Sequence, residues 1–184
     1  MNQINVQRPS SERQQLSTEE QSALWTLLDT LTDPEIPVVT LREMGILRAL
    51  RRGADGAVEV VITPTYSGCP AMDQIADDIG ATLRNAGVRG RVVTQLAPAW
   101  TTDWMSEAAK AKLRSYGIAP PHTTTPGSDT AIRFASRHRA TDTVACPQCG
   151  SVNTTETSHF GSTACKALYK CLDCLEPFDY FKSY

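Results

Sequence analysis

The chain has no long apolar run, no apolar N-terminal segment and little excess charge of either sign. The formal net charge is −2 over 184 residues, so no general basic field attracts nucleic acid or an anionic membrane. No stretch approaches the roughly 18 apolar residues that a membrane span needs. The polar first residues lack the apolar core of a secretory signal. These absences predict a cytoplasmic protein that binds neither nucleic acid nor membrane.

Histidine is also scarce, with only His122, His138 and His159. A catalytic cysteine usually needs a neighbouring histidine as general base, and the chain before residue 119 holds Cys69 but no histidine. This argues against a thiol hydrolase, and we predict no catalytic residue. Six cysteines in a reducing compartment indicate metal ligands or reactive thiols before disulfides.

Residue periodicity predicts a compact α+β domain over residues 17–118. Ser17-Thr-Glu-Glu20 fits a capping box, and leucines at helical spacing follow it. The order helix–strand–strand–helix–strand–helix is expected. The expected bounds are a helix over 18–31, a hairpin of strands over 46–51 and 57–63, a helix over 70–86, a strand over 91–96 and a helix over 103–116.

The remaining segments differ in composition from this domain. Residues 1–16 are predicted to be a disordered N-terminus. Residues 119–143 are predicted to be a linker, because prolines and threonines are followed by a basic cluster. Contact of that cluster with an acidic partner is the alternative. Residues 144–184 hold the remaining cysteines.

Two Cys-x-x-Cys pairs form the strongest motif, Cys146-Pro-Gln-Cys149 and Cys171-Leu-Asp-Cys174. Each tight turn directs two thiolates at one site, and the two turns supply a tetrahedral shell for Zn²⁺ or a single iron. A segment of about 40 residues rarely supports its own core, so metal binding would supply much of its folding free energy. We predict a zinc-ribbon-like module over 144–184 with structural zinc. Free thiols or disulfides are the alternative.

The Cys-Pro-Gln-Cys-Gly sequence at 146–150 resembles rubredoxin, in which the ion is iron and transfers electrons. Iron is therefore the alternative metal, and a rubredoxin-like electron-transfer component is the alternative function.

Cys165 lies outside the two pairs, next to Lys166. It is predicted to be an exchange ligand or a reactive thiol, with a small buried side chain as the alternative. His159 is a further possible ligand, but four cysteines already complete the shell.

Cys69 precedes Pro70 at an expected helix start, where the helix dipole and free amide donors are expected to lower the pKa of the thiol. Asp33 and Glu35 lie on a rigid Asp-Pro-Glu-Ile-Pro loop. Thiolate and carboxylates at one end of the domain would make a partial, labile metal site suited to transient binding. A packing role for Cys69, and caps or surface charges for the carboxylates, are the alternatives.

Several segments resemble the iron–sulfur assembly domain of the SufT-like type. They are Asp-Pro-Glu-Ile-Pro at 33–37, Val-Val-Thr-Leu-Arg-Glu-Met-Gly-Ile at 38–46, Thr-Pro-Thr-Tyr-Ser-Gly-Cys-Pro at 63–70 and the Trp100 to Trp104 segment. With the ribbon and its Phe-Gly-Ser-Thr-Ala-Cys-Lys at 160–166, the arrangement resembles the PaaD family, an accessory component of bacterial phenylacetyl-CoA 1,2-epoxidase systems, over about 17–184.

The resemblance implies a role in aerobic phenylacetate degradation. There, a di-iron oxygenase works with a reductase that carries flavin and a [2Fe–2S] cluster. The PaaD component would be an accessory protein that matures or delivers an iron–sulfur or di-iron centre, or alternatively a structural or regulatory subunit. Cys69 would bind iron or a cluster transiently, supported by Asp33 and Glu35. One such cysteine per chain favours a homodimer that supplies two thiolates. Trp100 and Trp104 are expected to wedge the last helix against the sheet.

Overall fold

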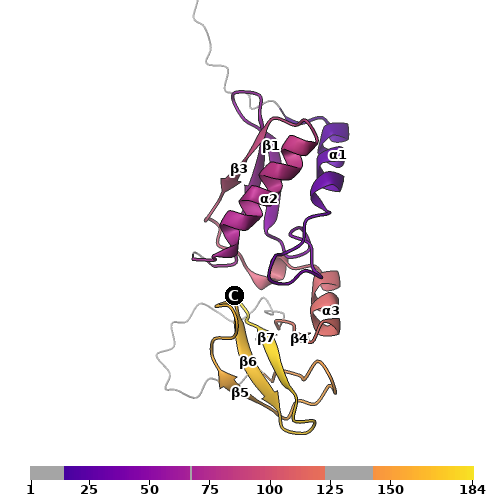
Figure 1. The fold of residues 1–184 in the computed structure, drawn as a ribbon, viewed down its shortest axis with the longest axis vertical. Coiled ribbons are helices and arrows are strands. Elements are labelled where there is room, and N and C mark those ends of the chain that lie inside the picture. The colour runs from indigo at the N-terminus through magenta and orange to yellow at the C-terminus, as the bar shows by residue number, and fades with distance from the viewer. Residues whose placement is uncertain (1–14, 67, 123–142) are drawn as a thin grey trace, which may run out of the picture.

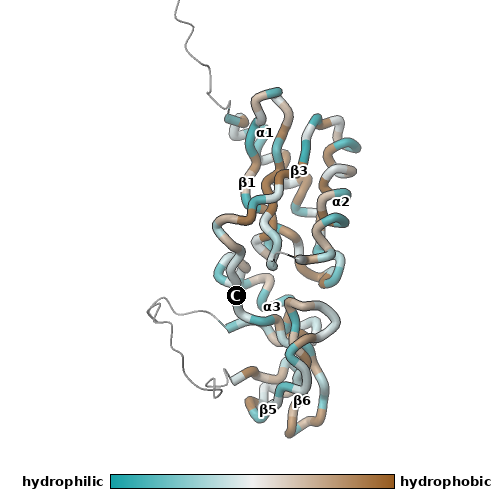
Figure 2. Tube along the Cα trace, turned by 90° about the vertical axis from the view of Figure 1, so that its left-hand side faces the viewer, coloured by the Kyte–Doolittle hydropathy of each residue, from teal (hydrophilic) through white to brown (hydrophobic). Residues whose placement is uncertain are grey.

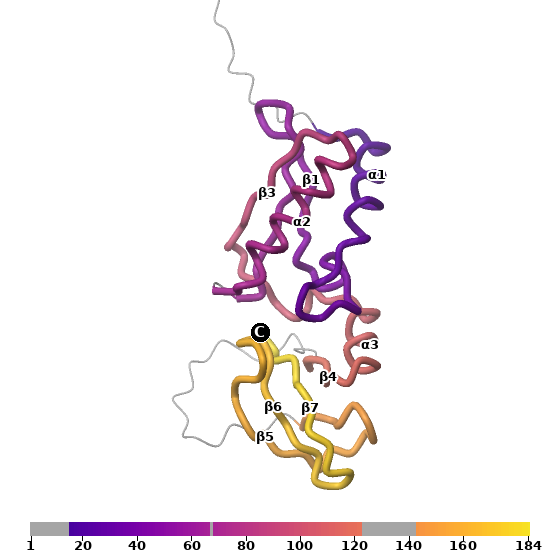
Figure 3. The backbone as a smooth tube through the Cα atoms, in the orientation of Figure 1, coloured from indigo at the N-terminus to yellow at the C-terminus, as the bar shows by residue number. Residues whose placement is uncertain are grey.

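The computed structural model describes residues 15–66, 68–122 and 143–184. The expected disordered N-terminus, apart from its last two residues, and most of the expected linker lie outside the described residues. Two modules lie one above the other along the long axis, and the C-terminus lies at their junction (Figures 1 and 3). We call residues 15–117 the N-terminal module and residues 143–184 the ribbon. No helix in the described ranges has the length and apolar character needed to cross a membrane.

The N-terminal module confirms the expected α+β order. The hairpin β1–β2 is antiparallel, whereas β2 and β3 are parallel and α2 forms the crossover between them, giving the sheet order β1-β2-β3. The elements are α1 (Thr18–Leu28), β1 (Leu47–Arg52), β2 (Val58–Ile62), α2 (Ala71–Asn85), β3 (Gly90–Thr94), the 3-10 turn η1 (Thr102–Trp104) and α3 (Glu107–Ser115).

Burial of one face of α2 against the sheet organises the core of this module. Ile75, Ile79 and Leu83 repeat at helical spacing and are almost fully buried, as are Val60 and Ile62 of the central strand. Figure 2 shows the hydrophobic segments concentrated in the strands, with hydrophilic segments along the outer side of α2.

The first helix begins as predicted but ends earlier. Ser17 and Glu20 form the capping box, with each side chain accepting the other's backbone N–H. The helix ends at Leu28 rather than at residue 31, because the following residues pair elsewhere: Leu41 N–H donates to the Leu31 carbonyl over 2.9 Å. The pairing of Leu31 with Leu41 therefore ends the helix before its expected bound.

The expected single helix over 103–116 is wrong. The chain forms the short turn η1, becomes extended at Met105, and starts α3 at Glu107, where the Ser106 hydroxyl accepts the Ala109 N–H over 3.0 Å. The two tryptophans have different partners. The Trp104 ring lies 3.4 Å from the Arg48 guanidinium, and Trp100 packs against the ribbon.

The ribbon forms a sheet of order β4-β7-β6-β5. Its strands are β5 (Thr154–Ser158), β6 (Lys166–Cys171) and β7 (Pro177–Phe181), completed by β4 (Ile118–Ala119), which follows α3 directly and pairs in parallel with β7. The first residue of the expected linker, Ala119, is thus an edge residue of the ribbon sheet.

The left-handed backbone of Gly45 supports a close approach by η1. Its φ is +73°, and an added Cβ would lie 2.7 Å from Trp104 Cβ. We expect Gly45→Ala to cost about 1–2 kcal/mol for the backbone conformation and about 1–3 kcal/mol more for the overlap. Gly56→Ala is the matched control, since its φ is +76° with nothing within 4 Å. Equal losses in denaturant unfolding of the metal-loaded variants would contradict the close approach.

Candidate metal centre and inter-module cysteine site

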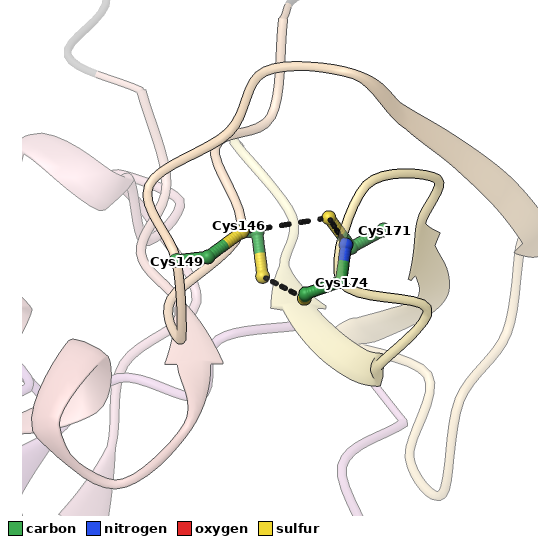
Figure 4. Close-up of side chains that lie close together, drawn as sticks. All are labelled: Cys146, Cys149, Cys171 and Cys174. Atoms are coloured by element: carbon green, nitrogen blue, oxygen red, sulfur yellow. Dashed lines mark hydrogen bonds between the residues drawn. The ribbon is translucent and has the colours of Figure 1, made fainter.

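The structure brings together the four cysteines of the two Cys-x-x-Cys pairs (Figure 4). All four sulfurs lie within 4.8 Å of one another. Cys146 Sγ lies 3.8 Å from Cys174 Sγ, and Cys149 Sγ lies 3.6 Å from Cys171 Sγ. A tetrahedral shell with metal–sulfur bonds of about 2.3 Å places its sulfurs about 3.8 Å apart. The four residues therefore fit one thiolate-bound ion.

The two turns that carry these cysteines have matching backbone conformations. Gly150 and Leu175, each directly after the second cysteine of its pair, have φ of 75° and 67°. The Cys174 N–H points at the Cys171 sulfur over 3.4 Å. This amide, followed by that of Asp173, outweighs burial and lowers the pKa of Cys171 to about 7. The Cys171 thiolate therefore suits a cation.

Sequence reasoning missed Asp173, which ties the two turns together. Its carboxylate accepts hydrogen bonds from the Ser151 hydroxyl and, over 2.7 Å, from the Asn153 amide. In the sequence, Asp173 lies between the two cysteines of the second pair, and its partners closely follow the first pair. This position beside the metal ligands was the signal that could have identified it. The bonds fix the separation of the turns and so orient the ligands.

Cys165 is not part of this four-sulfur group, and neither is His159. Strand β6 runs from Lys166 to Cys171, so about 20 Å of extended chain separates Cys165 from the nearest ligand at about 3.3 Å per residue. The expectation that Cys165 exchanges with the ribbon ligands is wrong. His159 has a side chain 58% exposed and lies 3.3 Å from Glu156.

Cys165 lies instead at the junction with the N-terminal module. It is 6% exposed and belongs, with Phe181, to the same buried cluster as the core of that module. Tyr66 and the half-buried Cys69 pack against this cluster. Burial, followed by the charges of Cys69 and Cys165, raises the pKa of Tyr66 to about 12. A buried thiol of the ribbon thus belongs to the cluster against which a half-buried thiol of the N-terminal module packs.

The two predicted carboxylates lie close enough to act on these thiols. Asp33 is 8% exposed, and its Oδ1 accepts the N–H groups of Glu35 and Ile36, each over 2.9 Å. Asp33 therefore caps its own loop, which is the alternative role stated above for the carboxylates. Burial raises its pKa, against these bonds and the charge of Lys166 from the ribbon. The charge of Glu35 acts on both Cys69 and Cys165.

The expected low pKa of Cys69 is wrong. The Ala71 N–H at the start of α2 does favour the thiolate, but burial is the larger effect, and the charges of Glu35 and Asp33 add to it. The pKa of Cys69 therefore lies above its ordinary value. One helix-start amide does not offset removal of a thiolate from water.

Alkylation of Cys69 is expected to be slow at neutral pH and to accelerate as pH rises, because the thiolate is the nucleophile and its pKa is raised. Glu35→Gln removes a negative charge that disfavours the thiolate, so its alkylation at pH 7.5 should be faster. Peptide-resolved iodoacetamide labelling measures this. Glu19→Gln, which removes an exposed carboxylate from α1, is the control and should leave the rate unchanged. A Glu35→Gln rate equal to that of this control would contradict the expectation.

Comparison with known proteins matches both modules. A family model described as "Iron-sulfur cluster assembly protein" matches residues 21–95, and one described as "PaaD zinc beta ribbon domain" matches residues 131–182. The chain thus joins an iron–sulfur cluster assembly domain to a zinc β-ribbon. It belongs to the PaaD family: it is 47% identical over 160 residues to an Escherichia coli K12 protein named as a component of a "Putative 1,2-phenylacetyl-CoA epoxidase", covering 86% of this chain and 90% of that protein.

Two further relatives each match about half of the chain. A Porphyromonas gingivalis protein named "Fe-S protein maturation auxiliary factor" is 38% identical over 100 residues, covering 53% of this chain and 92% of that protein. The crystal structure of a domain of unknown function, DUF59, from Bacillus anthracis is 26% identical with a TM-score of 0.46, covering 50% of this chain and 90% of that one.

Proposed function

We propose that this protein is an accessory subunit of a phenylacetyl-CoA 1,2-epoxidase system that matures or delivers an iron–sulfur or di-iron centre. Its targets are the di-iron oxygenase and the flavin/[2Fe–2S] reductase of that system, and it acts in the cytoplasm. Cys69 is the transient ligand for iron or a cluster, with Glu35 and Asp33 beside it. The four ribbon cysteines hold zinc, which stabilises the ribbon.

The half-buried Cys69 at the start of α2 carries this proposal. It lies in the iron–sulfur assembly module, the Ala71 N–H at the start of α2 favours its thiolate, and the charges of two carboxylates act on it. The Cys69 sulfur can donate a lone pair to an arriving metal, whose other coordination positions then stay open for handover. The ribbon site, by contrast, is closed by four thiolates, and a closed shell leaves no position for handover. The names of two relatives, a component of a putative phenylacetyl-CoA epoxidase and an Fe–S protein maturation auxiliary factor, support an accessory role in maturation.

The iron content of the partner components tests the proposal. Oxygenase and reductase are purified from cells that contain the wild-type protein, Cys69→Ser, Glu19→Gln or no protein at all. We expect normal iron with the wild type and with the surface control Glu19→Gln, and iron-poor components in the other two cases. Normal loading without the protein would overturn the proposal. If Cys69→Ser supports normal iron loading but absence of the protein does not, the protein is a structural or regulatory subunit.

An electron-transfer component is the second candidate, because the sulfur separations of 3.6 and 3.8 Å suit iron as well as zinc. Iron in the ribbon would give a coloured protein with a reversible redox couple, whereas zinc is spectroscopically silent. We expect a colourless protein with one zinc per chain. An absorption spectrum with metal analysis decides between the two metals.

A further inference from the structure

The ribbon contributes two buried polar groups to the junction, Cys165 and Lys166. Cys165 is 6% exposed and Lys166 is 5% exposed. The Lys166 ammonium lies 3.4 Å from the Asp179 carboxylate, and its charge also acts on Asp33 of the other module. A buried lysine carries a substantial desolvation cost unless anionic groups balance it. Lys166 therefore brings a positive charge to the junction, where it favours the ionised forms of Asp33 and Cys165 against the larger effect of burial.

Hydrogen bonds fix the turn that presents Cys165. The Lys182 N–H donates to the Cys165 carbonyl over 2.9 Å, and the Lys166 N–H donates to the Thr163 carbonyl over 3.1 Å. The Thr163 hydroxyl lies 3.0 Å from the Cys165 sulfur. The thiol is therefore held directly by its own turn, and the distant four-sulfur site affects it only by keeping the ribbon folded.

The C-terminal residue fastens this turn to the N-terminal module. The Tyr184 hydroxyl donates to the Ala164 carbonyl over 3.3 Å. The Tyr184 carbonyl in turn accepts the Thr102 N–H over 3.3 Å, and its ring packs edge-on against Trp100 at 6.2 Å. Docking of the ribbon thus places Cys165 in the core cluster against which Cys69 packs.

We propose that Cys69 and Cys165 are the paired thiolate ligands of one iron site at the junction, so that a single chain supplies both thiolates. This rests on the proposed function and replaces the homodimer that one cysteine per chain would require. Binding of Fe²⁺ forms two Fe–S bonds and releases the two thiol protons to solvent. In the described residues only the ribbon cysteines form a closed group of three or more ligands within 4.8 Å. The junction pair therefore leaves coordination positions open for handover.

Chemical crosslinking of the full-length, zinc-loaded protein tests the pairing directly. Dibromobimane becomes strongly fluorescent when it bridges two neighbouring thiols. We expect a Cys69–Cys165 crosslinked peptide pair in the wild type, and its absence in Cys69→Ser and in Cys165→Ser. Separate single labelling of both thiols in the wild type, without the crosslink, would overturn the pairing.

Anaerobic Fe²⁺ binding by the zinc-loaded protein tests the function of the pair. Each of Cys69→Ser, Cys165→Ser and Cys165→Ala should weaken binding by at least about 10- to 100-fold, the loss seen even for outer-shell changes, and the double variant should bind little more weakly than either single one. Ribbon zinc should stay at one per chain throughout. If Cys165→Ser misfolds, Fe²⁺ binding by Cys165→Ala and the crosslink in the wild type decide whether Cys165 is a ligand.

The outcomes separate this inference from the proposed function. Wild-type Fe²⁺ binding by Cys165→Ser or Cys165→Ala, with binding lost in Cys69→Ser, would overturn the pair and leave the proposed function standing. Normal iron in the oxygenase and reductase without the protein would overturn the proposed function, whatever Fe²⁺ binding shows.

Discussion

Cys171→Ser is expected to release the metal ion and unfold residues 143–184. Cys171 is fully buried, and its sulfur faces that of Cys149. A structural four-cysteine zinc site supplies about 10–16 kcal/mol of apparent binding free energy in small metal-folded domains. The separate core of the ribbon sheet has only seven buried residues among those described, of which two are ligands themselves. Loss of one ligand should therefore remove most of what holds the ribbon together.

The measurements are zinc per chain and the amide proton spectrum of the ribbon. Far-UV circular dichroism should keep its helical signal, because all three α-helices of the described residues belong to the N-terminal module. Cys165→Ser is the chemically matched control, since the same replacement lies in the same module but outside the four-sulfur group. It should retain one zinc per chain. A folded, fully loaded Cys171→Ser would contradict the four-ligand assignment.

The sequence predicts the ribbon site well because its geometry is local. The backbone of a Cys-x-x-Cys turn by itself directs both sulfurs to one point. Only the position of one turn relative to the other then depends on the rest of the fold. Their second ligands, Cys149 and Cys174, are each followed by a residue in the left-handed conformation. A glycine such as Gly150 indicates that conformation in the sequence, whereas a leucine such as Leu175 does not.

The junction site is a different case, because it depends on how the modules dock. Cys69 and Cys165 are 96 positions apart (165 − 69), and no motif links them. Their approach is set by Trp100 and the C-terminal aromatic residues. The same limit applies to the pKa of Cys69. The helix start is visible in the sequence, but the burial and carboxylates that outweigh it belong to the tertiary structure.

Phe181→Ala should be the most damaging substitution at the junction. The ring is 1% exposed and lies 6.1 Å from that of Trp100, whose indole N–H donates to the Met44 carbonyl over 3.0 Å. Truncation of a buried phenylalanine typically costs about 3–5 kcal/mol. Because Phe181 ends β7 and belongs to the core cluster of the other module, we expect the cost to fall on docking. The metal-bound ribbon should separate while keeping its zinc.

Denaturant unfolding and peptide-resolved alkylation together measure this effect. In Phe181→Ala, Cys69 and Cys165 should both be labelled faster, because undocking returns both thiols to water and lowers the burial that raises their pKa values. Phe160→Ala is the matched control in the same module: its ring is 62% exposed and contacts the Lys182 ammonium at 4.5 Å. It should cost less than about 1 kcal/mol and leave both labelling rates unchanged. Faster labelling of Cys165 without that of Cys69 would mean that the two thiols do not share one docked interface.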